Sequence, residues 1–270
     1  MDAWGADAGI DLVAEEHDGG LWAIQAKAYD PAYAIKKSDV DSFLSESARP
    51  GFVYRLLIAT TDRIGERARR TIQEQERRAG TRLRSQLEEA PVTWPRSLRT
   101  LRPARPRPHK PRPHQRKAVR EIEQGLENGD RGQAIMACGT GKTLVGLWAA
   151  EQLDSTRTLV LLPSLSLLAQ TLREWTANAS APFDYLAVCS DETVTGEDQF
   201  VSHTSELGLP VTTDPDEIAA FQRKRGRRVV FSTYQSTPQI AAAFEGRIPR
   251  FDLAVADEAH QPPTHQRSLS

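Results

Sequence analysis

The chain has 270 residues, of which 39% are hydrophobic and 26% are charged, and its formal net charge is −1. This is the composition of a globular protein with one large domain or two ordinary ones, and it excludes a disordered chain. No apolar run approaches the ~20 residues of a membrane-spanning helix, and the N-terminus lacks the basic and apolar stretches of a signal peptide. The two cysteines, Cys138 and Cys189, have no metal-ligand spacing. We therefore expect a cytoplasmic protein without structural zinc or a disulfide framework.

The first ninety residues predict a small α/β domain. Two segments of strand character flank the turn sequence "HDGG" and predict a hairpin. A helix capped by Ser38, a buried apolar strand and an Arg/Glu-rich helix with a narrow apolar stripe are expected to follow. In chain order, these elements are expected over residues 9–16, 21–29, 39–47, 52–61 and 63–79.

A basic, proline-rich segment separates this region from the rest of the chain. Residues 91–111 alternate Pro with Arg, which favours extended polyproline II and predicts a linker between two domains, 1–90 and 112–270. Residues 91–120 carry ten Lys or Arg and no acid, a charge of +10. Such a block suits the phosphate backbone of a nucleic acid, although a solvated linker in an Arg-rich protein would have the same composition.

After the linker, the pattern alternates between apolar strands and helices. An amphipathic helix is predicted over 114–129, and helices over 142–152, 164–177 and 216–224 follow, the last capped by Asp214. Buried strands are predicted over 132–137, 157–163, 184–190, 227–234 and 251–257. This alternation indicates a parallel α/β sheet.

A phosphate-binding loop is predicted in "MACGTGKTL", between the strand at 132–137 and the helix at 142–152. Met136 occupies the position of the first glycine in the general G-x-x-x-x-G-K-T pattern. The backbone N–H groups of the loop would wrap a phosphate, Lys142 would reach the β- and γ-phosphates, and Thr143 would ligate Mg²⁺. The residues assigned to ATP here are Cys138, Gly139, Thr140, Gly141, Lys142 and Thr143.

An acidic pair ends the last predicted strand. Asp257 stands where a Mg²⁺-holding acid is required, and Glu258 can orient the attacking water as a general base. Taken alone, Asp-Glu at a strand end is more often a helix cap; the loop at 137–143 favours the catalytic interpretation.

With these motifs, residues 112–260 resemble the first RecA-like lobe of superfamily 2 DNA helicases, especially the DEAH-type motors of type III restriction systems. "RPHQRKAV" resembles the adenine-sensing motif, which implies Arg112 and Gln115 near the base. "LVLLPSLSLLAQTLREW" and "VVFSTYQS" resemble the DNA-contacting motifs, which imply Ser164 and Thr233 at the DNA. The resemblance implies ATP and Mg²⁺ as cofactors, DNA as the partner, and a second RecA-like lobe in the full-length proteins.

A second constellation lies in the predicted hairpin. Asp11 is in its first strand, and alternation places Gln25 and Lys27 on one face of its second strand. Asp11 and Gln25 could hold Mg²⁺, and Lys27 could stabilise the charge that develops during phosphodiester cleavage. On spacing alone, a surface hairpin with ordinary charges would explain the same residues.

The stretch "GADAGIDLVAE…LWAIQAKAY" is similar to the core of the PD-(D/E)XK nuclease domain of Mrr-type restriction endonucleases. The family usually has an upstream helix with a Glu, and only ten residues precede Asp11 here. Since no second lobe follows "DEAH" either, we expect this chain to lack helicase activity. The expected protein is a Mg²⁺-dependent endonuclease fused to an ATP-driven motor lobe; the alternative is a non-catalytic fragment that binds ATP and DNA, or the product of a disrupted gene.

Overall fold

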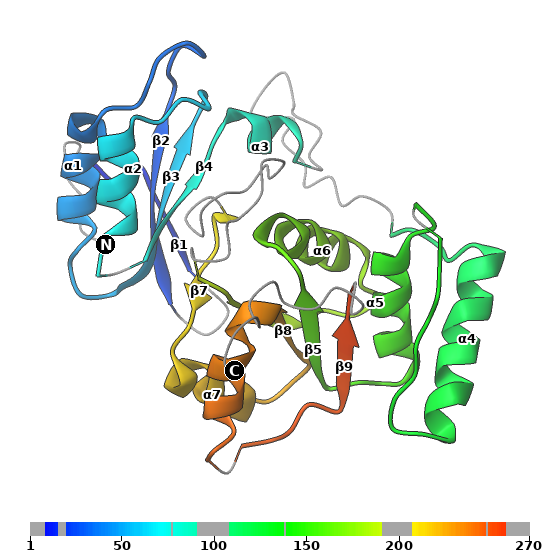
Figure 1. Ribbon diagram of the computed structural model, residues 1–270. Helices are drawn as coiled ribbons and strands as arrows, with labels where there is room; N and C mark the ends of the chain where they lie inside the picture. Colours follow the sequence, from blue (N-terminus) through cyan, green and yellow to red (C-terminus); the bar gives the residue numbers. More distant parts are fainter. Residues whose placement is uncertain are drawn as a thin grey trace, which may run out of the picture. The chain divides into compact units, whose positions relative to one another are not determined.

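The computed structural model describes residues 9–15, 20–76, 78–90, 108–137, 139–190, 207–246 and 248–257. The chain divides into two compact units, Met1–Pro91 with Val201–Val211, and Val92–Phe200 with Thr212–Ser270. Most of the linker predicted at 91–111 lies outside the described residues. Both units are α/β, as predicted (Figure 1).

The first unit contains a four-stranded mixed sheet with the order β1-β2-β3-β4. Its elements are β1 (Leu12–Glu15), β2 (Leu21–Lys27), α1 (Lys37–Glu46), β3 (Phe52–Ala59), α2 (Glu66–Gln73), β4 (Ala79–Arg82) and α3 (Arg84–Glu88). β1 pairs with β2 antiparallel, and β2, β3 and β4 pair in parallel. The predicted hairpin is thus confirmed.

Helices α1 and α2 supply one side of the core of this unit (Figure 1). Val40 and Phe43 of α1 and Ile72 of α2 are buried in one cluster with Ala23 of β2 and Leu57 of β3. Side chains alternate along a strand, so Gln25 and Lys27 share the face of Ala23. Helix α2 is shorter than the predicted 63–79, because the chain turns into the unpredicted strand β4 at Ala79.

The second unit contains a five-stranded sheet with the order β7-β6-β8-β5-β9. Its elements are α4 (Pro113–Glu127), α5 (Lys142–Gln152), β5 (Arg157–Leu162), α6 (Leu165–Asn178), β6 (Asp184–Val188), β7 (Val211–Thr212), α7 (Pro215–Arg223), β8 (Arg228–Thr233), η4 (Tyr234–Ser236), α8 (Thr237–Ala243) and β9 (Leu253–Ala256). The ladders that join β6, β8, β5 and β9 are parallel, as predicted.

Two helix layers enclose this sheet. On one face, Trp175 of α6 meets Phe231 of β8 edge-on, with ring centroids 5.5 Å apart. On the other face, Ile218 of α7 and Ile240 of α8 pack with Val230 of β8. The predicted cap of α7 is also present, since the Asp214 side chain accepts a hydrogen bond from the Asp216 N–H.

The strand predicted over 132–137 is not formed. Its residues have no strand assignment, and Ile135 is 88% exposed. An apolar run becomes a strand only where a neighbour takes up its backbone N–H and C=O groups. β9 is the last strand in the sheet order, and among the described residues it pairs with β5 alone. Residues 132–137 pair with neither β9 nor β5. Across the same described ranges, no helix is long and apolar enough to cross a membrane.

Candidate functional sites

The predicted phosphate-binding loop has the backbone that its glycines predict. Gly139 and Gly141 have φ values of 74° and 82°, in the left-handed region that favours glycine. Gly141 is the N-cap of α5, and its C=O accepts from Val145 N–H at 3.2 Å. The Thr140 hydroxyl donates back to Ala137 O at 2.6 Å. Lys142 and Thr143 therefore form the first turn of α5, where unpaired N–H groups favour an anion. Cys138 lies outside the described residues.

Gln115 is tied to this loop. It is 6% exposed, and its Nε2 donates to Thr140 O at 2.8 Å. Its Oε1 accepts from the Arg112 backbone N–H at 2.8 Å, and Arg112 is itself exposed at the start of α4. A Cβ placed on Gly141 would lie 2.5 Å from Gln115 Nε2. Sequence reasoning assigned Gln115 to a nucleotide base and missed that its side chain braces the loop.

The start of α5 and the end of β9 lie at the same edge of the sheet. Gly146 of α5 faces Val255, since a Cβ on Gly146 would be 3.3 Å from Val255 Cγ1. At the opposite end, Ser155, just after α5, hydrogen-bonds to Asp252, just before β9. The helix and the strand thus run side by side in opposite directions. Lys142 and Thr143, the first residues of α5, therefore lie toward Asp257, where the chain leaves β9.

Asp257 is held by its backbone. Its N–H donates to Leu161 O at 2.9 Å, and its C=O accepts from the Tyr234 hydroxyl at 2.6 Å. These two bonds fix the end of β9 relative to β5 and η4, so the position from which the carboxylate extends is well defined. Glu258, the predicted general base, lies outside the described residues.

The two residues expected at DNA lie at this same edge. Ser164 is the N-cap of α6, where its hydroxyl accepts from Leu167 N–H at 3.3 Å. Thr233 ends β8 and is fully buried, with its hydroxyl donating to Ser236 Oγ at 3.2 Å. In this arrangement the Thr233 side chain supports the turn into η4 and presents no surface to a ligand.

In the first unit, Asp11 lies beside the part of β2 that carries Gln25 and Lys27. Asp11 Oδ2 accepts from the backbone N–H of Ala26, the residue between Gln25 and Lys27, at 2.7 Å. The Asp11 N–H donates to Ile24 O at 2.9 Å, which holds the residue beside β2. Lys27 is half-buried at the end of β2, and its C=O accepts from Thr60 N–H at 3.1 Å.

Gln25 has the most unusual environment of the three. It is 2% exposed, and its Oε1 has no hydrogen-bond partner among the described residues. A buried amide oxygen without a donor is costly, so a cation or a bound water at this position would be stabilising. The described parts of the chain contain no group of three or more His, Cys, Asp or Glu that could hold a metal. Carboxylate and amide oxygens, such as those of Asp11 and Gln25, are of the type that Mg²⁺ prefers.

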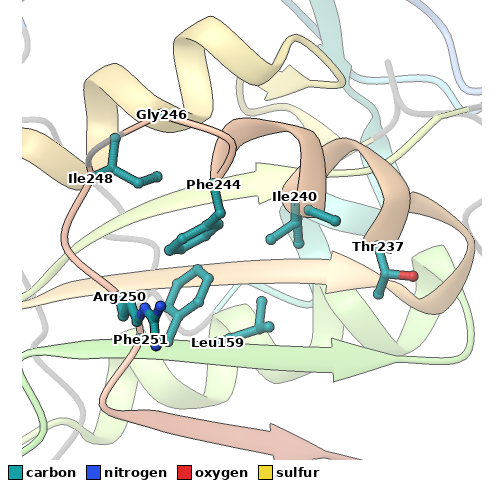
Figure 2. A pocket seen from close by; sticks show the side chains of 9 residues that line it. Leu159, Thr237, Ile240, Phe244, Gly246, Ile248, Arg250 and Phe251 are labelled. Carbon is teal, nitrogen blue, oxygen red and sulfur yellow. The ribbon is translucent and has the colours of Figure 1, made fainter.

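A cavity lies elsewhere in the second unit. It has a volume of about 970 Å³ and lies between α8, β5 and the segment that follows α8 (Figure 2). Ile240, Phe244, Phe251 and Leu159 give it an apolar wall, and Arg250 is the one charged residue among its described lining residues. In open α/β sheets ligands bind beyond the carboxyl ends of the strands, and this cavity instead faces the middle of β5 through Leu159. Its position and its apolar wall do not suit a nucleotide.

The fold defines a restriction-endonuclease-like unit joined to a helicase-like unit. Residues 1–102 match a family model described as restriction endonuclease, and residues 108–268 match one described as type III restriction enzyme, res subunit. The chain belongs to this res-subunit family, and its resemblance to Mrr-type nucleases and restriction-type helicases is confirmed.

Known proteins give the same assignment. The structure of the ATP-dependent Type ISP restriction-modification enzyme LlaBIII bound to DNA aligns with a TM-score of 0.80 and 33% identity, covering 93% of this chain and 17% of that one. The probable helicase A859L of African swine fever virus is 29% identical over 147 residues in isolate Tick/South Africa/Pretoriuskop Pr4/1996 and 30% identical in isolate Tick/Malawi/Lil 20-1/1983. These matches cover 54% of this chain and 16% of each viral protein.

Proposed function

We propose that the first unit cleaves DNA phosphodiester bonds with the help of Mg²⁺, and that the second unit binds ATP with Mg²⁺ at the loop before α5. The nuclease proposal rests on one observation above all. The Asp11 carboxylate accepts a hydrogen bond from the N–H of Ala26, the residue after Gln25, and the buried Gln25 Oε1 has no hydrogen-bond partner among the described residues. The family of the chain supports both halves of the proposal.

Each nuclease residue has a separate task in this proposal. Asp11 and Gln25 would hold the metal, which when bound supplies Lewis-acid polarisation of the scissile phosphate. The bond from Ala26 N–H fixes one carboxylate oxygen of Asp11 and leaves Oδ1 for the cation. Lys27 would place its ammonium group against the phosphate oxygens as negative charge develops on them. Because Lys27 is attached to the ordered end of β2, its side chain would need little rearrangement to reach the phosphate.

In the second unit, loop N–H groups and Lys142 would bind the phosphates, while Thr143 and Asp257 would hold the magnesium. The positive φ values of Gly139 and Gly141 and the brace from Gln115 support a preformed loop. Glu258 would orient the attacking water. We further infer that DNA is the partner, and that ATP-driven movement belongs to longer proteins in which a second RecA-like lobe closes on the nucleotide.

Nicking of supercoiled plasmid tests the nuclease assignment. We expect Mg²⁺-dependent nicking by the purified chain, abolished in Lys27→Ala and retained in the control Lys224→Ala, an exposed residue at the end of α7. Nicking that survives Lys27→Ala would refute the assignment.

A DNA-stimulated ATPase assay with Lys142→Ala separates the two possible functions of the second unit. Turnover that disappears in the variant supports an ATPase. Nucleotide binding that requires Lys142 without any turnover supports the alternative, a non-catalytic ATP- and DNA-binding module.

A further inference from the structure

Two tyrosines follow the strand that carries the proposed nuclease residues. The rings of Tyr29 and Tyr33 are stacked at a tilt of 32°, with centroids 4.6 Å apart. Tyr29 packs against the hydrophobic core of the first unit, and both side chains are only half-buried. The pair therefore keeps a partly exposed aromatic surface, and the packing of Tyr29 against the core holds that surface in place.

The backbone that carries these tyrosines is firmly held. The Thr60 hydroxyl donates to Tyr29 O at 2.6 Å, and the Thr61 hydroxyl donates to Tyr33 O at 2.8 Å and to Pro31 O at 3.1 Å. Both threonines directly follow β3. An aromatic surface held in this way loses little conformational freedom when a ligand binds to it.

A lysine at the pair could pair with an anionic group of a ligand. Lys36 Nζ is 5.8 Å from the centroid of the Tyr33 ring. Two acids lie by the pair, and both are engaged: Asp39 Oδ2 accepts from the Tyr33 hydroxyl at 2.9 Å and from Lys36 N–H at 2.8 Å, and Asp30 Oδ1 accepts from Ala32 N–H at 2.8 Å. The hydrogen bond to Asp39 raises the pKa of Tyr33, with burial adding to it, so the phenol stays neutral at physiological pH.

We propose that Tyr29, Tyr33 and Lys36 form a stacking site for an unpaired DNA nucleotide, which guides the strand toward Lys27. A base would stack on the tyrosine surface, and Lys36 would move to the adjoining phosphate. Aromatic rings beside a mobile cation are the combination that binds single-stranded nucleic acid without sequence preference. Tyr29 is two residues beyond Lys27, so a nucleotide bound here lies close to the proposed cleavage site. The inference rests on the proposed nuclease function of this unit.

Fluorescence anisotropy with an end-labelled oligo(dT), in EDTA to prevent cleavage, measures this site. We expect Tyr33→Leu to weaken binding roughly five- to twentyfold, because one stacked base is lost. Tyr33→Phe keeps the ring and should bind within about twofold of the unmodified chain. Tyr185→Leu is the matched control, since Tyr185 is a 37% exposed tyrosine of the other unit. Equal affinity of Tyr33→Leu and the unmodified chain would overturn the proposal.

Two further measurements keep the test decisive. If Tyr33→Leu lowers the melting temperature strongly, the Lys36→Gln variant is tested in its place. We expect the slope of log affinity against log salt concentration to be smaller for Lys36→Gln by about 0.7 than for the unmodified chain. An unchanged slope would count against the proposal. Photocrosslinking with 5-iodouracil should attach the strand to the peptide that contains Tyr33, and crosslinks confined to other peptides would exclude the site. Because binding is measured in EDTA, where no cleavage occurs, the affinity of Tyr33→Leu for oligo(dT) does not depend on the cleavage chemistry, and loss of nicking and loss of stacking are separable failures.

Discussion

The side-chain amide of Gln115 fills the space beside Gly141, with its Nε2 2.5 Å from the position that a Cβ on Gly141 would take. The same nitrogen donates to Thr140 O at 2.8 Å. A residue at the start of α4 thus sets the shape of a loop twenty-five positions later in the chain. The glycine serves two purposes here, since it also has a positive φ of 82°.

Gly141→Ala should therefore damage the loop in two ways. A left-handed φ costs an L-residue about 1–2 kcal/mol, and the new methyl group displaces Gln115. We expect a lower free energy of unfolding by about that amount and at least roughly tenfold weaker binding of a fluorescent ATP analogue. Gly125→Ala is the control, because a methyl group on Gly125, inside α4, would meet nothing within 4 Å; it should stabilise by about 0.5–1 kcal/mol. Equal nucleotide affinity in both variants would contradict the role given to the loop.

The hydrogen bonds of Asp252 predict that part of the folding stability depends on pH. Burial raises the pKa of Asp252, but hydrogen bonds from Ser155, Thr156 and Arg157 outweigh it and leave the pKa below its usual value. A lowered pKa in the folded state gives stability that is present above the unfolded pKa of about 3.9 and lost as the pH falls through the folded pKa.

Asp252→Asn should cost about 1 kcal/mol at pH 7, a value kept small because the carboxylate is partly exposed. The cost should shrink as the pH falls below about 4, where the unmodified chain loses the same contribution. Urea melts between about pH 3 and pH 7 measure this, with the exposed Asp130→Asn as the control. If Asp252→Asn lowers the free energy of unfolding by the same amount at every pH in this range, the stabilising effect of these hydrogen bonds does not depend on the ionisation of Asp252.

Local patterns predicted much of the fold because each element carries its own signal. Asp214 caps α7 as its sequence position suggests, and helix 142–152 has the predicted bounds. The strand at 132–137 failed because strand formation depends on a neighbour, which an apolar run does not reveal. Similarly, the pattern placed Gln25 and Lys27 on one face, but it could not show that Asp11 binds the Ala26 N–H. Contacts between residues distant in sequence produce no periodic pattern in the sequence, so they cannot be predicted from it.

Replacing Gln222 is expected to raise the stability of the protein. It is fully buried in α7, and both its Oε1 and its Nε2 have no hydrogen-bond partner among the described residues. Leaving a buried polar group unpaired costs about 1–3 kcal/mol, and methionine has a similar shape without this cost. Gln222→Met should therefore raise the melting temperature by several degrees, about 2–4 °C per kcal/mol. The exposed Gln124→Met should change it little. A lower melting temperature for Gln222→Met would indicate that a bound water satisfies the amide.

Trp175 links the packing of the second unit to the loop proposed to bind phosphate. Its side chain is 1% exposed, and its Nε1 donates to Thr143 O at 2.9 Å, so the indole holds the first turn of α5 against α6. Trp175→Phe keeps an aromatic ring against Phe231 but removes this bond and leaves the Thr143 carbonyl to find another donor. We expect a loss of about 1–3 kcal/mol in stability from the missing bond and the smaller ring, and weaker nucleotide binding because the turn that carries Lys142 and Thr143 is less ordered. Chemical denaturation and titration with a fluorescent ATP analogue measure the two effects separately. If stability falls while nucleotide affinity stays unchanged, the indole serves packing alone, and the order of the first turn of α5 must come from Gln115 and the loop.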